Sequence, residues 1–258
     1  MKAMNLFLRL AFPPRCAGCG ERFDIFENDT IGAFCPTCRA AWEREKMSVC
    51  KGCGHESVSC DCVGRFLKDT RVLSLVKFGQ KGCVDRLIYS LKRKRNDRFF
   101  DFASEELYKR LKSEEALMGA DFSDAVITNV PRRIKTRREF GFDHAATLAE
   151  AVSELMGVDY SGLLKRRLGG KPQKKTGGAR RFKNVKGRFA AISDASIEGK
   201  TVILIDDVMT TGATASECVR ELKRVGAAEV ILLTIARAES EKKQRRKKVT
   251  KGEKNGAV

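Results

Sequence analysis

The sequence lacks any apolar run long enough to cross a membrane, and it is poor in proline. Only 5 of its 258 residues are prolines, while 42% are hydrophobic. The apolar stretch within residues 1–12 is too short and interrupted for a signal peptide. Because this composition is typical of globular proteins, we expect a packed core. Because the sequence has neither a membrane-spanning run nor a signal peptide, we expect a cytoplasmic location.

Acidic residues are scarce relative to basic ones. The chain has 51 Lys and Arg against 33 Asp and Glu, a formal net charge of +18. Such an excess favours a polyanionic partner such as nucleic acid, a phosphorylated metabolite or an anionic membrane. A basic surface with a disordered tail would explain the same charge. Residues 239–258 form such a basic, low-complexity tail, for which we expect disorder and weak, nonspecific affinity for nucleic acid.

Cysteine is concentrated in one part of the chain. Eight of the ten cysteines lie between residues 16 and 62, mostly in Cys-x-x-Cys pairs. In a reducing compartment this pattern indicates metal binding, so we expect one or two structural zinc ions. The expected ligands are Cys16, Cys19, Cys35, Cys38, Cys50, Cys53, Cys60 and Cys62.

Two pairings of these cysteines are compatible with the sequence. In the first, the pairs that begin at Cys16 and Cys35 share an ion, with the 15-residue separation of a four-cysteine zinc ribbon. In the second, the pairs interleave, so that those beginning at Cys16 and Cys50 share an ion. His55 could replace a sulfur of the later site, but four cysteines are available and an exposed turn suits it better.

The most informative stretch runs from Val202 to Thr214. Residues 201–205 form an apolar, β-branched run typical of a strand buried on both faces. Asp206 and Asp207 follow at its carboxyl end, where open α/β sheets bind ligands. The segment from Thr214 to Glu217 matches a capping box, so we expect a helix to begin near Thr214.

This arrangement suits a phosphorylated sugar. Backbone N–H groups and the positive end of the helix dipole face the loop at 209–213, where a monophosphate fits and Gly212 allows close approach. Two adjacent carboxylates match the hydroxyls of a ribose, directly or through Mg²⁺. The alternative is that both carboxylates only cap and solvate the turn.

Two cationic segments are expected at the same edge of the sheet. A strand predicted at 125–130 leads into residues 131–138, five of which are basic. The Gly/Lys-rich segment 168–178 lacks apolar periodicity, so we expect a mobile lid, with a solvated linker as the alternative. The residues expected to meet a pyrophosphate are Arg132, Arg133, Lys135, Arg137, Gln173 and Arg181.

Two further features have competing interpretations. Phe99, Phe100 and Phe102 lie near the basic cluster 92–95; such a set can bind single strands, but phenylalanines of this kind are more often core. His144 lies near the start of a helix predicted at 141–156. We expect it to be a capping or surface residue and not a general base.

The 202–214 stretch resembles the phosphoribosyl-pyrophosphate (PRPP) motif of type I phosphoribosyltransferases. The resemblance implies an α/β fold with a twisted, mostly parallel sheet flanked by helices. It also implies that Asp206 and Asp207 contact the ribose hydroxyls of Mg²⁺-bound PRPP and are the catalytic carboxylates. The implied PRPP-binding residues are Asp206, Asp207, Val208, Met209, Thr210, Thr211, Gly212, Ala213 and Thr214.

The order of motifs over residues 12–237 resembles the ComF family of competence proteins. It begins with Phe-Pro-Pro-Arg-Cys at 12–16 and ends with the PRPP motif, whereas residues 139–144 depart from the family's Arg-Gly-Phe-Asn-Gln string. The resemblance implies a zinc-ribbon domain at 1–64, a phosphoribosyltransferase-like domain at 65–238 and a tail at 239–258. It further implies a role in DNA uptake. The implied partners are PRPP, single-stranded DNA and uptake helicase or channel proteins at the inner membrane.

Enzymatic turnover is a separate question. An active Mg²⁺-dependent phosphoribosyltransferase would release pyrophosphate, but no feature of the sequence identifies its acceptor. A binding module would hold PRPP as a regulatory ligand while its basic surface binds DNA. A regulator of transcription that uses the fold as a sensor is the least favoured of the three.

Overall fold

The computed structural model describes residues 15–22, 33–47, 67, 70–79, 82–91, 96–132, 141–167, 185–192 and 197–238. None of the helices within these ranges has the length and apolar character needed to cross a membrane. The helices and strands are α2 (Pro36–Lys46), β1 (Arg71–Phe78), α3 (Cys83–Leu91), α4 (Asp97–Met118), β2 (Val126–Asn129), α6 (His144–Met156), β3 (Asp159–Tyr160), β4 (Leu164–Arg166), β5 (Phe189–Ala191), β6 (Thr201–Met209), α8 (Ala213–Arg224) and β7 (Glu229–Ala238).

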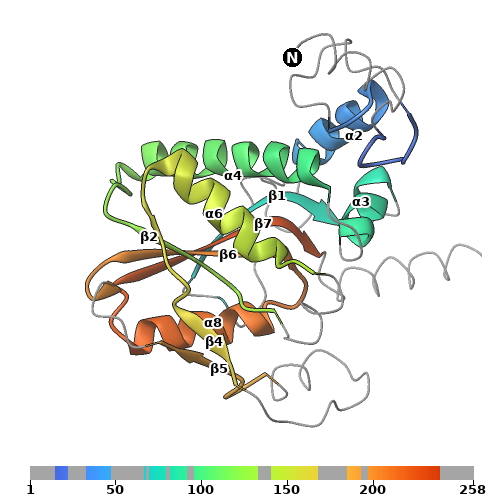
Figure 1. Ribbon diagram of the computed structural model, residues 1–258. Helices are drawn as coiled ribbons and strands as arrows, with labels where there is room; N and C mark the ends of the chain where they lie inside the picture. Colours follow the sequence, from blue (N-terminus) through green and yellow to red (C-terminus); the bar gives the residue numbers. More distant parts are fainter. Residues whose placement is uncertain are drawn as a thin grey trace, which may run out of the picture.

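A five-stranded parallel sheet in the order β1-β7-β6-β2-β3 forms the centre of the molecule. Its middle strands β6 and β7 are buried apolar runs, as expected for strands covered on both faces. Helices α4 and α6 lie on one face of the sheet, and α8 lies on the other with the antiparallel pair β4–β5 (Figure 1). The predicted parallel sheet flanked by helices is therefore confirmed.

The alternation of side chains along the strands feeds two separate apolar cores. Ile203 and Ile205 of β6 pack toward α4 and α6, whereas Val202 and Leu204 pack toward α8 and β5. Because the strands are parallel, their carboxyl ends lie together at one edge of the sheet. This edge carries the acidic pair of β6.

Several elements differ in extent from the sequence-based expectation. Strand β6 continues four residues beyond Ile205, the last residue of the predicted apolar run. The strand that precedes the basic loop covers Val126–Asn129, and β1 comes before it in the same sheet. Helix α6 ends as predicted, because Gly157 adopts the left-handed conformation of a C-cap.

Helix α2, next to the cysteine pairs, packs on α4 through an aromatic junction. Trp42 is fully buried, and its ring centroid lies 5.9 Å from that of Phe99 and 5.7 Å from that of Phe102. Phe34 completes the cluster at 5.3 Å from Phe102. The phenylalanines of α4 are therefore core residues, as the favoured interpretation held; the basic cluster 92–95 lies outside the described residues.

Candidate functional site

The acidic pair lies on the part of β6 that projects beyond β2. Register pairing between these strands ends at Asn129 and Ile205, where the N–H of Val130 still donates to the Ile205 carbonyl at 2.9 Å. Asp206 and Asp207 come directly afterwards and border β7 on their other side. The loop that follows β2 therefore reaches the two carboxylates.

Asp207 is held by two cationic or ionisable side chains from different elements. Arg132, two residues after Val130, donates from Nη2 to Oδ2 of Asp207 at 3.1 Å. The Nδ1 atom of His144, at the start of α6, lies 3.4 Å from the same oxygen. The other oxygen, Oδ1, accepts the N–H of Val208 at 2.8 Å. Three segments thus converge on one carboxylate.

The two carboxyl groups have opposite electrostatic environments. Burial raises the pKa of Asp207, but the imidazole of His144 and the charge of Arg132 outweigh burial and hold that pKa below its ordinary value. Burial, and then the neighbouring Asp207 charge, raise the pKa of Asp206 well above its ordinary value. Asp207 is therefore the stable anion of the pair, while Asp206 keeps its proton more tightly.

His144 is placed differently from the expectation that it caps a helix or lies on the surface. It is fully buried, its ring stacks on Phe100 at 4.9 Å between centroids, and Phe142 lies 4.4 Å away. The capping role belongs to Asp143, whose Oδ1 accepts the N–H of Ala146 at 3.5 Å. Single-sequence patterns missed His144 because its burial depends on α4, which lies far away in the chain.

Polar atoms near Asp207 remain without a hydrogen bond. Nη1 of Arg132 and both ring nitrogens of His144 are buried and have no hydrogen-bond partner among the described groups. Buried donors are normally satisfied, so unpaired ones beside a carboxylate are typical of a site that receives a ligand. The predicted contact of Arg132 with a pyrophosphate stays a prediction.

The predicted phosphate loop lies between the end of β6 and α8. Gly212 has a φ of 74° and is the N-cap of α8, which begins at Ala213. The positive φ favours glycine, and a Cβ atom there would lie 2.8 Å from Cδ1 of Leu67, whose side chain would have to shift. Met209 and Ala213 are buried, Thr211 and Thr214 are partly exposed, and Thr210 is exposed.

The capping box predicted at 214–217 is wrong. With Gly212 as the N-cap, Glu217 lies too far into α8 to return to the cap. Glu217 is instead buried, where it accepts the N–H of Gly187 and binds Arg220. Gly212 has no side chain with which to cap the helix, and the N–H of Ala213 donates to Oγ1 of Thr211 at 3.4 Å. The other N–H groups of the first turn suit an anion at the loop.

The remaining residues predicted to meet a pyrophosphate lie outside the described ranges. They are Arg133, Lys135, Arg137, Gln173 and Arg181. The predicted lid at 168–178 and the tail at 239–258 lie outside them too. The structure therefore brings together Arg132, the acidic pair and residues 208–214.

A second group of functional side chains is the cluster Cys16, Cys19, Cys35 and Cys38. Their Sγ atoms all lie within 4.8 Å of one another, as the first of the two predicted pairings requires. Burial raises the pKa of the Cys16 thiol, but N–H groups, that of Cys35 foremost, outweigh burial and lower the pKa to about 7. A Cβ atom at Gly18 would lie 2.9 Å from Sγ of Cys38, so the turn needs glycine. Such a four-sulfur set suits a closed, structural zinc site.

Two family models match the chain in the order that the motifs predict. Residues 7–72 match a double zinc ribbon domain, and residues 143–257 match a phosphoribosyl transferase domain. The chain is therefore similar to a double zinc ribbon followed by a phosphoribosyl transferase domain. The ribbon model and the four-cysteine cluster together support structural zinc, whereas Cys50, Cys53, Cys60 and Cys62 lie outside the described residues.

Two named proteins are similar to this chain over most of its length. Competence protein F of Haemophilus influenzae is 23% identical over 237 residues, covering 90% of this chain and 93% of that protein. DNA utilization protein YhgH of Salmonella typhimurium is 24% identical over 210 residues, covering 79% and 90%. The predicted resemblance to the ComF family is thereby confirmed.

Among solved structures, the chain is similar to the glutamine PRPP amidotransferase of B. subtilis complexed with ADP and GMP. The identity is 27% and the TM-score 0.30, and the match covers 42% of this chain. This chain spans only about a fifth of that enzyme, 21% of its length.

Proposed function

We propose that this protein is a cytoplasmic, PRPP-binding member of the ComF type that serves DNA uptake by handling the incoming single strand. The observation that carries the PRPP part is the convergence of Arg132 and His144 on Asp207, beside an uncapped helix N-terminus at Gly212. The names of the similar proteins, competence protein F and a DNA utilization protein, support the DNA part. Domain bounds at 64 and 238, and the number of zinc ions, stay predictions.

In this proposal each part of PRPP has its own contact. The 5′-phosphate lies in the loop 210–214, against the first N–H groups of α8. Asp206 and Asp207 meet the ribose hydroxyls, directly or through Mg²⁺, which is the hard cation that such oxygen ligands suit. The unpaired Nη1 of Arg132 meets the pyrophosphate, with Arg133, Lys135, Arg137, Gln173 and Arg181 as further cations and donors.

Calorimetric titration of PRPP into the zinc-loaded protein tests this part. We expect binding that requires Mg²⁺ and is lost when Asp206 and Asp207 are both changed to Asn. Lys165→Gln is the matched control, because this exposed cation lies on β4 and forms no ion pair with a described carboxylate. Equal affinity in the double variant, or no binding by the wild type, would contradict the assignment.

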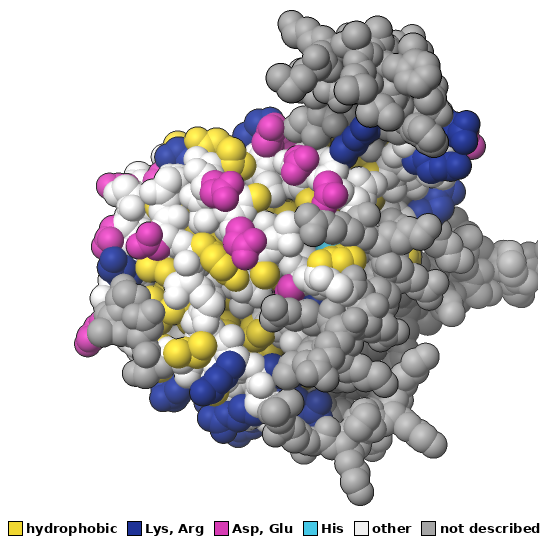
Figure 2. All heavy atoms as spheres, viewed as in Figure 1, with side chains coloured by type: hydrophobic (Ala, Val, Ile, Leu, Met, Phe, Trp, Pro, Cys, Tyr) yellow, Lys and Arg dark blue, Asp and Glu magenta, His cyan; other side chains and the backbone are white. Residues whose placement is uncertain are grey.

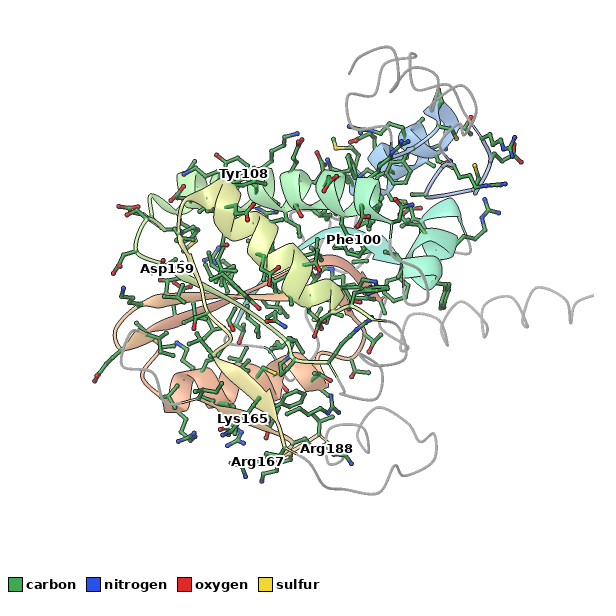
Figure 3. All side chains as sticks on the ribbon, viewed as in Figure 1. Phe100, Tyr108, Asp159, Lys165, Arg167 and Arg188 are labelled. Carbon is green, nitrogen blue, oxygen red and sulfur yellow. The ribbon has the colours of Figure 1, made fainter. Side chains whose placement is uncertain are left out.

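The DNA part is supported by an uneven charge distribution. Acidic side chains gather over α4 and α6, whereas Lys and Arg side chains gather near α8 and the β4–β5 pair and also beside α2 (Figure 2). Lys165, Arg167 and Arg188 lie together near the β4–β5 pair (Figure 3). Arg167 and Arg188 lie across from each other next to this pair, where the N–H of Arg167 donates to the Arg188 carbonyl at 2.8 Å. Phosphates of a single strand suit such a surface.

Fluorescence anisotropy with a labelled oligothymidine tests the DNA part. We expect affinity to fall steeply with salt, because each neutralised phosphate releases a counterion. Changing Lys165 and Arg167 to Gln together should weaken binding and flatten the salt dependence. Lys109→Gln, on the acidic face of α4, should leave both unchanged. Salt-independent affinity, or equal loss in both variants, would argue against this surface.

An active phosphoribosyltransferase is the second candidate. The observation that favours it is the buried His144, whose ring nitrogens lack hydrogen-bond partners among the described groups beside the acidic pair. Such a group could move a proton or bind the departing pyrophosphate, while the cations stabilise its developing charge. Pyrophosphate release from PRPP across an acceptor panel, lost in Asp207→Asn, would support turnover. Stable PRPP binding with no release would favour the binding role alone.

A further inference from the structure

Arg237, near the end of β7, is a buried cation without a hydrogen-bonding partner. Only 3% of the residue is exposed, yet Nε, Nη1 and Nη2 make no hydrogen bond to any described group. No described carboxylate forms an ion pair with it. In a structure where buried donors are normally satisfied, five unpaired N–H groups on one side chain need an explanation.

The charge of Arg237 makes that explanation more demanding. A guanidinium does not lose its proton in proteins, so it cannot escape the cost of burial by becoming neutral. A buried charge is expected to be paired with a counter-charge. Its planar fork of donors matches the two oxygens of a carboxylate or phosphate.

A second buried cation lies beside it. Lys77 of β1 is the register neighbour of Arg237 and is only 8% exposed. Register neighbours in a parallel sheet project to the same face, so the two charges add. Asp85 is the nearby buried acid on α3, but its two oxygens already accept the N–H groups of Gly79 and Gly82.

The position of this pair relates it to the candidate PRPP site. On the other side, the register neighbour of Arg237 is Met209, the last residue of β6 before the phosphate loop. Further back, Thr234 of β7 is the neighbour of Asp206, and its hydroxyl bonds Ser74 at 2.9 Å. The cations Lys77 and Arg237 therefore lie at the same edge of the sheet as the acidic pair, on β1 and β7 and not on β6.

We infer that Lys77 and Arg237 form a second anion site, which binds the carboxylate or phosphate group of a small molecule at the carboxyl edge of β1 and β7. This inference extends the proposed function and rests on it in one respect, namely that the neighbouring ligand is PRPP. PRPP would occupy the loop after β6, and the second site would select a partner molecule that carries its own anionic group. The site thus defines a class of second ligand, or of acceptor if the protein turns over.

Thermal unfolding and calorimetry of the zinc-loaded full chain test the site at constant ionic strength. The probes are benzoate, its neutral counterpart benzamide, and inorganic phosphate. Benzoate should raise the unfolding midpoint of the wild type and benzamide should not, because binding to the folded state stabilises it. Phosphate raising the midpoint through Arg237 would extend the site to phosphate groups; phosphate acting only through the loop would restrict it to carboxylates.

Variants distinguish anion binding by Arg237 from a purely structural role of this side chain. Arg237→Gln should abolish the benzoate response and weaken benzoate binding about tenfold or more, as expected for a charge-assisted pair. Its midpoint without anions should equal or exceed that of the wild type, because an unpaired buried charge is removed. Lys77→Gln and Arg237→Lys are conservative in size, so we expect both variants to fold. Each should weaken benzoate binding. Lys109→Gln, which removes an exposed cation of α4, should respond as the wild type does.

Three outcomes would overturn the inference. They are no benzoate response in the wild type, an equal response in Arg237→Gln, and a lower midpoint of Arg237→Gln without anions, which would reveal an internal partner. The double Asp206→Asn/Asp207→Asn variant distinguishes failure of this site from failure of the proposed function. Benzoate binding that persists there while PRPP binding is absent supports the second site by itself.

Discussion

The aromatic junction between α2 and α4 and the carboxyl edge of the sheet bury side chains in opposite ways. At the junction, Phe34, Trp42, Phe99 and Phe102 pack edge to face, and the Lys46–Glu106 ion pair lies alongside. The junction leaves the neutral Nε1 of Trp42 without a hydrogen-bond partner among the described groups. At the edge, the unpartnered buried atoms are instead Nη1 of Arg132, the ring nitrogens of His144 and the guanidinium nitrogens of Arg237. The first arrangement is typical of a core and the second of a site awaiting a ligand.

This difference indicates which region stabilises the fold of a chain whose candidate site lowers the free energy of unfolding. Unpaired buried charges lower the free energy of unfolding, so they persist only where other regions supply a surplus. The junction provides a large apolar surface and joins the cysteine module to the sheet domain. Substitutions at the junction should therefore change stability with little effect on ligand binding. Substitutions at the edge should change both stability and ligand binding.

The largest expected effect is that of Trp42→Ala. Trp42 is fully buried among three phenylalanine rings, and removing such a side chain typically costs about 3–5 kcal/mol. Urea unfolding measures the loss, and calorimetry under native conditions should show PRPP affinity unchanged for the folded fraction. Trp42→Phe should cost much less. Loss of PRPP affinity with intact stability would break the comparison.

Asp207→Asn should have the next largest effect. The change leaves the partly buried Arg132 without its carboxylate, which typically costs about 1–3 kcal/mol. Because the pKa of Asp207 is lowered in the folded state, its stabilising contribution is present above about pH 4 and is lost as the pH falls through the lowered value. Unfolding curves of both proteins should therefore converge in acid. Parallel curves at every pH would show that the Arg132 contact contributes nothing.

Gly212→Ala tests how far the edge depends on backbone conformation. A positive φ costs a non-glycine residue about 1 kcal/mol or more, and the new methyl group would meet Leu67. PRPP affinity should fall together with stability. Adding Leu67→Ala should relieve the collision but not the backbone strain, so the double variant should recover only part of the affinity. Full recovery would show that φ at this position is unimportant.

The sequence predicted those parts of the site that depend on local pattern. The apolar run of β6, the acidic pair and the glycine of the loop occur within one short stretch, so their order along the chain sets their arrangement. His144 and Arg237 were beyond reach because their burial depends on elements distant in sequence, namely α4 and β1. The capping box failed for a related reason. Thr214 and Glu217 match the local pattern, but Gly212 caps the helix and Gly187 draws Glu217 elsewhere.

Asp206→Asn should give the smallest effect and the opposite sign to Asp207→Asn. Burial and the Asp207 charge raise the pKa of Asp206, so ionising it costs more in the folded state than in the unfolded chain. Stability of the wild type is therefore lost as the pH rises from about 4, the value for an unfolded Asp, toward the raised folded value. The Asn variant escapes this loss and should be the more stable protein at neutral pH, with no advantage below about pH 4. Urea titrations at several pH values measure the difference. Paired with lost PRPP binding, a gain in stability would show that Asp206 is kept for its ligand and not for the fold; a loss would mean that its carboxylate has an internal partner.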